Sequence, residues 1–188
     1  MTTLEAAVSI EAKFSVKQKA EFRGETTLVI SREFIHGICQ FCKTQLGFDY
    51  LIDITSIDNF GDEPRFELVY ELYSMAGGAR LRLKLSVSED DLEVRTVSDV
   101  WATADWHERE IFDMMGIRFA GHPDLRRILM WDGYQYYPLR KDFPLAGKPS
   151  EVPEVAFTKS APLEGGPFVT IPSTATAKDR EPRARRQE

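Results

Sequence analysis

Two segments near the middle of the chain alternate apolar and polar residues. Residues 66–73 (FELVYELY) and 80–87 (RLRLKLSV) place a hydrophobic side chain at every second position. A period of two is typical of strands with one buried and one exposed face. Gly77 and Gly78 lie between the two segments, and glycine readily adopts the positive φ angles of a tight turn. The pattern therefore predicts an antiparallel hairpin.

The position of the turn fixes the expected register of this hairpin. Centred on the glycine pair, the register places Leu72 opposite Leu83 on the buried side. Glu71 then lies opposite Lys84 on the exposed side, and this opposite-charge pair favours the same register.

The rest of the hydrophobic pattern predicts three helices and three further strands. Ser31 and Thr103 are candidate N-caps, and Gly47 and Gly116 stand where helices are expected to stop. The expected helices are 3–14, 32–46 and 104–115, and the expected strands are 16–22, 26–30 and 50–58. This order predicts an α+β fold, in which a mainly antiparallel sheet carries its helices on one face.

The character of the chain changes near its C-terminal end. Residues 146–188 are rich in Pro, Gly, Ser, Thr and Ala and show no sustained period. Such a composition does not bury enough apolar surface to fold alone. We therefore expect an α+β domain over residues 1–145, followed by an extended tail over 146–188. The tail's sparse apolar residues favour a segment that lies along another protein, with a disordered tail as the alternative.

Composition and charge exclude several classes of function. The chain has 188 residues, of which 43% are hydrophobic, and a formal net charge of −6. An acidic chain has no broad attraction for nucleic acid. No apolar run approaches the roughly 20 residues of a membrane helix, and the first residues do not resemble a secretory signal. We expect a cytosolic chain that contacts a membrane only through its partners.

The two cysteines form a single C-x-x-C pair. Cys39 and Cys42 lie inside an expected helix. They are either a redox or metal-binding pair or two small apolar residues of a helix core. An iron–sulfur cluster or a structural zinc needs about four ligands, and the chain has no second cysteine pair. We favour the core interpretation.

Charged residues are densest between Trp106 and Leu129. A metal site would use His107, Glu110 and His122, but Ile111 stands where the zinc-protease pattern requires its second histidine. Spacing alone leaves three interpretations open: an interface network, a solvated helix and a catalytic site. In the first, residues four apart on one helix pair their charges, as expected for Asp105, Arg109 and Asp113. Arg126 and Arg127 are expected to pair with Glu108, with Glu110 or with a partner's carboxylates.

The same region resembles a known family. The matching residues are Glu108-Arg109-Glu110, Asp113-Met114-Met115, His122, Arg126 and Ile128-Leu129, with Trp101 and Trp106 before them and PLRKDFPL, residues 138–145, after them. In order and spacing they resemble the signature of the C subunit of proton-pumping NADH:quinone oxidoreductases, complex I. The resemblance extends over the layout of residues 22–145.

The resemblance implies a scaffold rather than a catalyst. In this family the chain is peripheral, on the cytoplasmic side of the inner membrane, and packs against the large quinone-site subunit, known as the D subunit. Electrons pass from NADH through FMN and iron–sulfur clusters in other subunits to quinone. The chain itself is then expected to hold no cofactor, metal or catalytic residue, and to be the separate form rather than the fused one.

The resemblance also suggests which residues contact the partner. The expected interface residues are Glu108, Arg109, Glu110, Asp113, His122, Arg126, Arg127, Arg140, Lys141 and Asp142. Two alternatives remain. The chain is the equivalent subunit of a related membrane-bound hydrogenase or other quinone reductase, or it is a standalone metal-dependent enzyme.

Overall fold

A five-stranded sheet forms the centre of the fold in the computed structural model, which describes residues 2–144. The strands are β1 (Val16–Phe22), β2 (Glu25–Ile30), β3 (Tyr50–Asp58), β4 (Phe66–Tyr73) and β5 (Arg80–Val87). Their spatial order is β1-β2-β5-β4-β3. β2 and β5 are parallel, and the other neighbouring pairs are antiparallel. The predicted α+β class with a mainly antiparallel sheet is confirmed.

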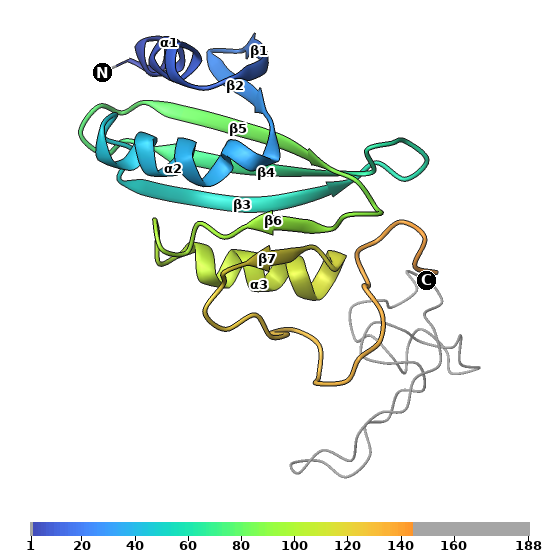
Figure 1. Cartoon of the computed structure of the whole chain (residues 1–188). Coiled ribbons are helices and arrows are strands. Elements are labelled where there is room, and N and C mark those ends of the chain that lie inside the picture. The colour runs from blue at the N-terminus through green and yellow to red at the C-terminus, as the bar shows by residue number, and fades with distance from the viewer. Residues whose placement is uncertain (1, 145–188) are drawn as a thin grey trace, which may run out of the picture. The chain divides into compact units, whose positions relative to one another are not determined.

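Three helices pack around the sheet within the unit formed by residues 1–140. They are α1 (Thr3–Lys13), α2 (Ile35–Thr44) and α3 (Ala104–Met115). Figure 1 shows α2 lying over one face of the sheet, roughly along the strands, and α3 beyond the edge strand β3. The predicted tail, 146–188, lies outside the described residues.

The two candidate N-caps and one pair of short strands differ from the prediction. The side chain of Thr103 makes no capping hydrogen bond at the start of α3. Ser31 precedes a short 3-10 helix, η1 (Arg32–Phe34), and its side chain makes no capping hydrogen bond, so α2 starts later than expected. A two-stranded parallel ribbon was not predicted, namely β6 (Glu93–Arg95) with β7 (Arg118–Ala120). Strands of this length carry too little pattern to be recognised from sequence.

The hairpin register is shifted from the prediction by two residues. Tyr70 lies opposite Leu83, and Glu71 opposite Arg82. The turn is longer than the predicted glycine pair, because Ser74 N–H donates to the Ala79 carbonyl at 2.9 Å across a four-residue loop. A shift of two leaves every side chain on its expected face, so the alternation is as predicted while the partners differ.

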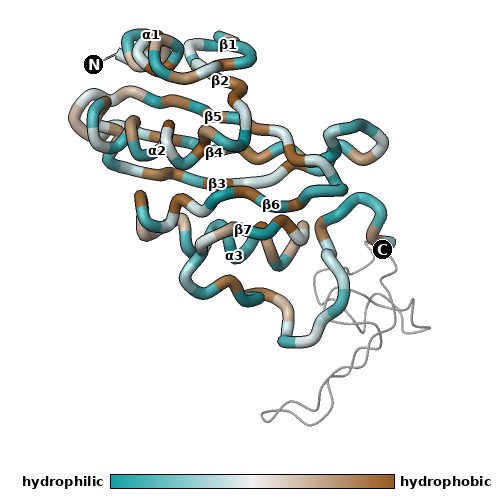
Figure 2. The backbone as a smooth tube through the Cα atoms, viewed as in Figure 1, coloured by the Kyte–Doolittle hydropathy of each residue, from teal (hydrophilic) through white to brown (hydrophobic). Residues whose placement is uncertain are grey.

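The inner face of the sheet and the helices enclose the core. Figure 2 shows hydrophobic and hydrophilic residues alternating along the strands. Cys39 and Cys42 of α2 are fully buried free thiols within this core. Burial raises the pKa of Cys39 well above its usual range and that of Cys42 to about 12. The prediction that both cysteines are core residues of a helix is confirmed.

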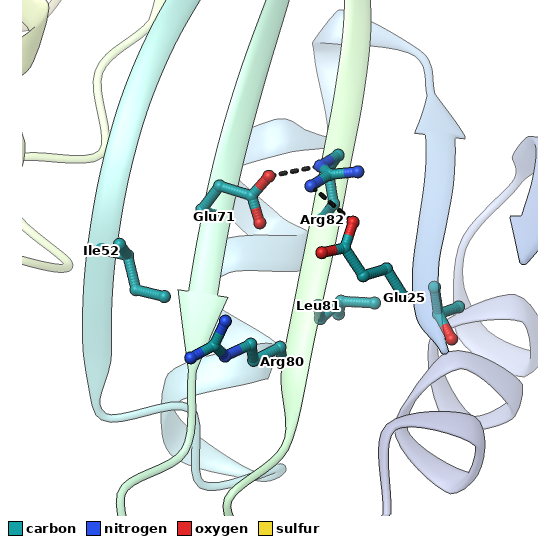
Figure 3. A pocket seen from close by; sticks show the side chains of 7 residues that line it. Glu25, Ile52, Glu71, Arg80, Leu81 and Arg82 are labelled. Atoms are coloured by element: carbon teal, nitrogen blue, oxygen red, sulfur yellow. Dashed lines mark hydrogen bonds and ion pairs between the residues drawn. The ribbon is translucent and has the colours of Figure 1, made fainter. Parts of the chain in front are cut away.

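The outer face of the sheet is polar, and charged side chains on neighbouring strands of this face form ion pairs with one another. Arg82 lies between Glu25 and Glu71, with Nη2 2.9 Å from the Glu25 carboxylate. These three side chains line a depression of about 180 Å³ together with Ile52 and Arg80. Figure 3 shows the side chains from close by. Lys84 pairs with Glu67 at 2.7 Å on the same face. These rows of opposite charge hold the hairpin in its observed register.

A candidate interface built on helix α3

Helix α3 buries charged residues as well as apolar ones. Gly116 ends the helix in the left-handed conformation, with φ of 80°. Glu108 and Asp113 are completely buried, and Arg109 is 7% exposed. Charged groups are rarely buried unless other groups satisfy them. The partners of these three side chains therefore decide what the charged region does.

Asp113 holds the segment that follows the helix. Its Oδ2 accepts backbone N–H groups from three consecutive residues, Ile128 at 3.1 Å, Leu129 at 2.7 Å and Met130 at 2.8 Å. Its Oδ1 accepts from Nη1 of Arg127 at 2.6 Å. One carboxylate thus fixes the path of a segment that has no regular secondary structure of its own. Hydrogen bonds to an ionised acceptor are stronger than neutral ones.

Arg109 supports the same segment from the neighbouring turn of the helix. Its Nε donates to the carbonyl of Arg126 at 3.1 Å, and its Nη2 donates to that of Arg127 at 3.4 Å. The guanidinium lies 5.1 Å from the centre of the Trp106 ring. The predicted row of ion pairs from Asp105 through Arg109 to Asp113 does not form, because Arg109 bonds to backbone carbonyls and Asp113 to Arg127.

The C-terminal end of α3 is closed by residues far along the chain. Arg127 Nη1 donates to the Asp113 carbonyl at 3.0 Å, Leu139 N–H to Met114 at 3.3 Å and Arg140 Nε to Met115 at 2.7 Å. The last carbonyls of a helix have no partner within it. Two arginines also place positive charge at the negative end of the helix dipole. Residues 127–140 therefore supply the donors that the last carbonyls of α3 lack, and α3 in turn fixes the path of these residues.

Gly116 allows this closure. A Cβ at this position would lie 2.6 Å from Cζ of Tyr137 and 2.8 Å from Nη2 of Arg140. The Arg140 guanidinium stacks 4.6 Å from the Tyr137 ring centre and 5.1 Å from that of Phe66. The close approach and the positive φ both require glycine. The sequence predicted the helix stop at this residue but not the packing against it.

Glu108 binds the segment after β6. Its Oε1 accepts the N–H of Val97 at 2.8 Å, and its Oε2 accepts the hydroxyl of Thr96. Burial raises the pKa of Glu108 to about 7, although both hydrogen bonds act to lower it. Neither Thr96 nor Val97 was anticipated as a partner, because neither belongs to a recognisable motif.

The ten predicted interface residues fall into two groups. Five of them, Glu108, Arg109, Asp113, Arg127 and Arg140, form hydrogen bonds to other segments of this chain, and the His122 side chain is completely buried. Glu110, Arg126, Lys141 and Asp142 are exposed. Arg126 pairs with Asp124 at 2.8 Å rather than with Glu108 or Glu110.

Large apolar side chains are exposed beside this network. Trp106 is 63% exposed, Leu129 is 55% exposed and Leu139 is 57% exposed. Trp106 contacts Arg109, and the backbone of Leu129 is fixed by Asp113. Leu129 and Leu139 were not among the predicted interface residues, because isolated leucines outside a periodic segment carry no burial signal in the sequence.

The residues proposed for a metal site are not brought together. His107 pairs with Asp53 at 3.1 Å, while His122 is buried on another side of the helix near Asp105. Among residues 2–144, no group of three or more His, Cys, Asp or Glu side chains has the arrangement of a metal site. In the same range, no helix is long and apolar enough to cross a bilayer.

Comparisons with known proteins identify the class to which this fold and charged network belong. Residues 28–149 match the model of a family described as respiratory-chain NADH dehydrogenase, 30 Kd subunit. The chain therefore belongs to the 30 Kd subunit family of respiratory-chain NADH dehydrogenase. The NADH-quinone oxidoreductase C subunit of Geobacter sulfurreducens is 47% identical over 149 residues, covering 78% of this chain and 92% of the relative. The NADH-quinone oxidoreductase C 2 subunit of Rhizobium meliloti is 47% identical over 135 residues, covering 71% of this chain and 74% of the relative.

Solved structures carry the same fold. The trypsin-resistant fragment (1-134) of Nqo5 is 33% identical with a TM-score of 0.58, covering 66% of this chain and 100% of that one. A chain of the membrane-bound sulfane sulfur reductase, an archaeal respiratory membrane complex, is 24% identical with a TM-score of 0.64. The match covers 75% of this chain and 85% of that one. The second likeness shows the fold alone.

Replacing Asp113 tests the central contact. Asp113→Asn removes the charge that pairs with the nearly buried Arg127, so the free energy of unfolding is expected to fall by about 3 kcal/mol. The matched control is Asp124→Asn, which removes an exposed pair with Arg126 and is expected to cost less than about 1 kcal/mol. Urea unfolding of the full chain at neutral pH measures both. Equal losses would contradict the role assigned to Asp113.

The packing at Gly116 is tested by a pair of glycine substitutions. Gly116→Ala and Gly133→Ala both place alanine at a positive φ, but only the first meets other atoms, since nothing lies within 4 Å of a Cβ at Gly133. Gly116→Ala is expected to lower stability by about 2 kcal/mol more than Gly133→Ala. Thermal unfolding of the two variants measures the difference, and a ranking in the other order would refute the close approach.

Proposed function

We propose that this chain is a non-catalytic scaffold subunit in the peripheral arm of a proton-translocating NADH-quinone oxidoreductase. It docks the large quinone-site subunit of that complex. The observation that carries the proposal is that the buried and the exposed side chains around α3 make different contacts. The buried charges fix residues 122–140 on the helix. Exposed apolar side chains lie on the surface that this segment and the helix form.

The exposed side chains suit a protein interface. The Arg109 guanidinium lies over the Trp106 ring and donates to the backbone carbonyl of Arg126. Leu129 lies three residues after Arg126, and its backbone N–H donates to Asp113. Interfaces are enriched in tryptophan and arginine, and few residues carry most of the binding energy. A tryptophan held by a fixed arginine loses little conformational freedom on binding.

The electron carriers belong to partner subunits in this proposal. Both thiols of the chain are buried, and burial raises the pKa of each. Iron–sulfur clusters are held by thiolates, about four to a cluster. The clusters are therefore assigned to neighbouring subunits. The proposal places FMN and quinone there as well, and the chain supports the geometry that spaces these groups. It joins the cytoplasmic side of the inner membrane through those subunits.

The relatives favour an NADH-fed complex over a related one. Those described above are named NADH-quinone oxidoreductase subunits and are 47% identical to this chain, whereas the likeness to the sulfane sulfur reductase is 24% identical. The alternative is the equivalent subunit of a related membrane-bound hydrogenase or other quinone reductase. The two are distinguished by the electron donor that the isolated complex oxidises.

Co-purification tests the docking surface. With the tagged full chain expressed in its own cells, Trp106→Ala and Leu129→Asp are expected to reduce recovery of the quinone-site subunit from detergent-solubilised membranes. Loss of one interface hot spot weakens binding by about 2 kcal/mol, or roughly 30-fold. The recovered subunit is identified by mass spectrometry.

Matched controls use equally exposed residues elsewhere. Phe22→Ala and Met75→Asp change side chains that are 68% and 65% exposed at the ends of the sheet hairpins, and full recovery is expected. Arg127→Glu is unsuitable, because it would break the bond to Asp113 and disturb the fold itself. If Trp106→Ala and Leu129→Asp recover the partner as well as the controls do, the proposed docking surface is wrong.

A further inference from the structure

Strand β5 carries three basic side chains on the outer face of the sheet, and one of them differs from the other two. Arg82 pairs with Glu71, and Lys84 pairs with Glu67 at 2.7 Å. Arg80 is exposed and, in the part of the chain that the structure describes, forms no ion pair. The charge of Arg80 is therefore left for solvent or for another molecule.

Carboxylates on the neighbouring strands and turns are already in use. Glu71 of β4 bonds to Arg82, which also lies 2.9 Å from the Glu25 carboxylate of β2. Asp49, which directly precedes β3, accepts a backbone N–H from the β4–β5 turn at 2.8 Å. A carboxylate that pairs with Arg80 without breaking these contacts therefore comes from outside the described residues.

Aromatic and apolar side chains surround Arg80. Its guanidinium lies 5.7 Å from the centre of the Tyr73 ring, and in the sheet register Tyr73 lies between Arg80 and Tyr50. Tyr50 is 50% exposed, and Ile52 is 40% exposed at an irregularity in the register of β3, where a strand can redirect a side chain. Ile52 and Arg80 line the same depression, and Figure 3 shows Arg80 extending toward Ile52.

This combination of residues is typical of a protein interface. A solvated face of an antiparallel sheet is mainly polar, as the paired Lys84 and Glu67 are. Tyrosine and arginine are enriched where partner chains meet, and they are frequent among the residues that carry most of the binding energy. A guanidinium beside a ring also offers its fork of N–H donors to a carboxylate, with which it forms two parallel hydrogen bonds.

We propose that Tyr50, Ile52, Tyr73 and Arg80 form a second docking surface, the Arg80 surface, which binds an acidic segment of another polypeptide. A carboxylate of that segment pairs with the Arg80 guanidinium, and an apolar side chain beside it packs on Tyr50 and Ile52. The unpaired positive charge selects an acidic partner, because a basic segment would meet a like charge. The Arg80 surface includes none of the side chains assigned to docking at α3, so this inference does not rest on the proposed function.

Photo-cross-linking identifies the segment that binds the Arg80 surface. The photoreactive amino acid p-benzoylphenylalanine replaces Tyr50 in the tagged full chain, which is expressed in its own cells and irradiated there. The control places it at Phe22, another exposed aromatic position, at the end of β1. Mass spectrometry is expected to find position 50, but not position 22, joined to a segment of another polypeptide with Asp or Glu beside the cross-linked residue. No such cross-link, a segment without an acidic residue, or a cross-link to a second copy of this chain overturns the proposal.

Binding of a synthetic peptide with the sequence of the cross-linked segment tests the role of Arg80. Arg80→Gln in the full chain is expected to weaken binding about tenfold, because a charge-assisted pair is lost. The matched control Lys84→Gln removes a positive charge from the same face of the same strand, but one that Glu67 already pairs, so nearly unchanged affinity is expected. Calorimetric titration measures both variants. Equal affinity of the native chain and Arg80→Gln overturns the proposal.

A change in the peptide tests the same contact without altering the fold. Replacing the acidic residue of the peptide by its amide is expected to weaken binding to the native chain as much as Arg80→Gln does, and an unchanged affinity overturns the proposal. Circular dichroism shows whether Arg80→Gln is folded, and if it is not, the amide peptide decides. Recovery of the quinone-site subunit through Trp106 and Leu129 is a separate measurement, so either docking surface can fail while the other stands.

Discussion

The structure around α3 depends on one carboxylate. Asp113 accepts the N–H groups of residues 128, 129 and 130 and the guanidinium of Arg127. Without it, three buried or half-buried donors and an arginine would lose their acceptor in a region with no regular secondary structure to replace it. The position of Leu129, the closure of the helix end by Arg127 and the course of the chain toward Arg140 follow from this contact.

Much of the charged signature of the family holds this chain together. The residues that look most like an interface network, Glu108, Arg109 and Asp113, turn inward and hold their own chain. Density of charge on a helix therefore does not by itself indicate a binding surface. The side chains that the proposed docking role assigns to a partner are the exposed ones, namely Trp106, Leu129 and Arg126.

Sequence predicted the parts of the fold in which one face of an element is buried. Alternation located β4 and β5, and glycine in the left-handed conformation ended α3 at Gly116. Alternation did not fix the hairpin register, because a shift of two residues preserves both faces and exchanges Lys84 for Arg82 opposite Glu71. The partners of Glu108 and Asp113 were not predictable, since most of them are backbone groups, which every residue type carries.

The closed end of α3 has a consequence for assembly. Carbonyls of Asp113, Met114 and Met115 are occupied by donors from residues 127–140, so peeling that segment away would strand several acceptors at once. The surface is thus complete before any neighbour arrives. In the proposed docking role, association joins a surface that is already formed, so little ordering entropy is lost on binding.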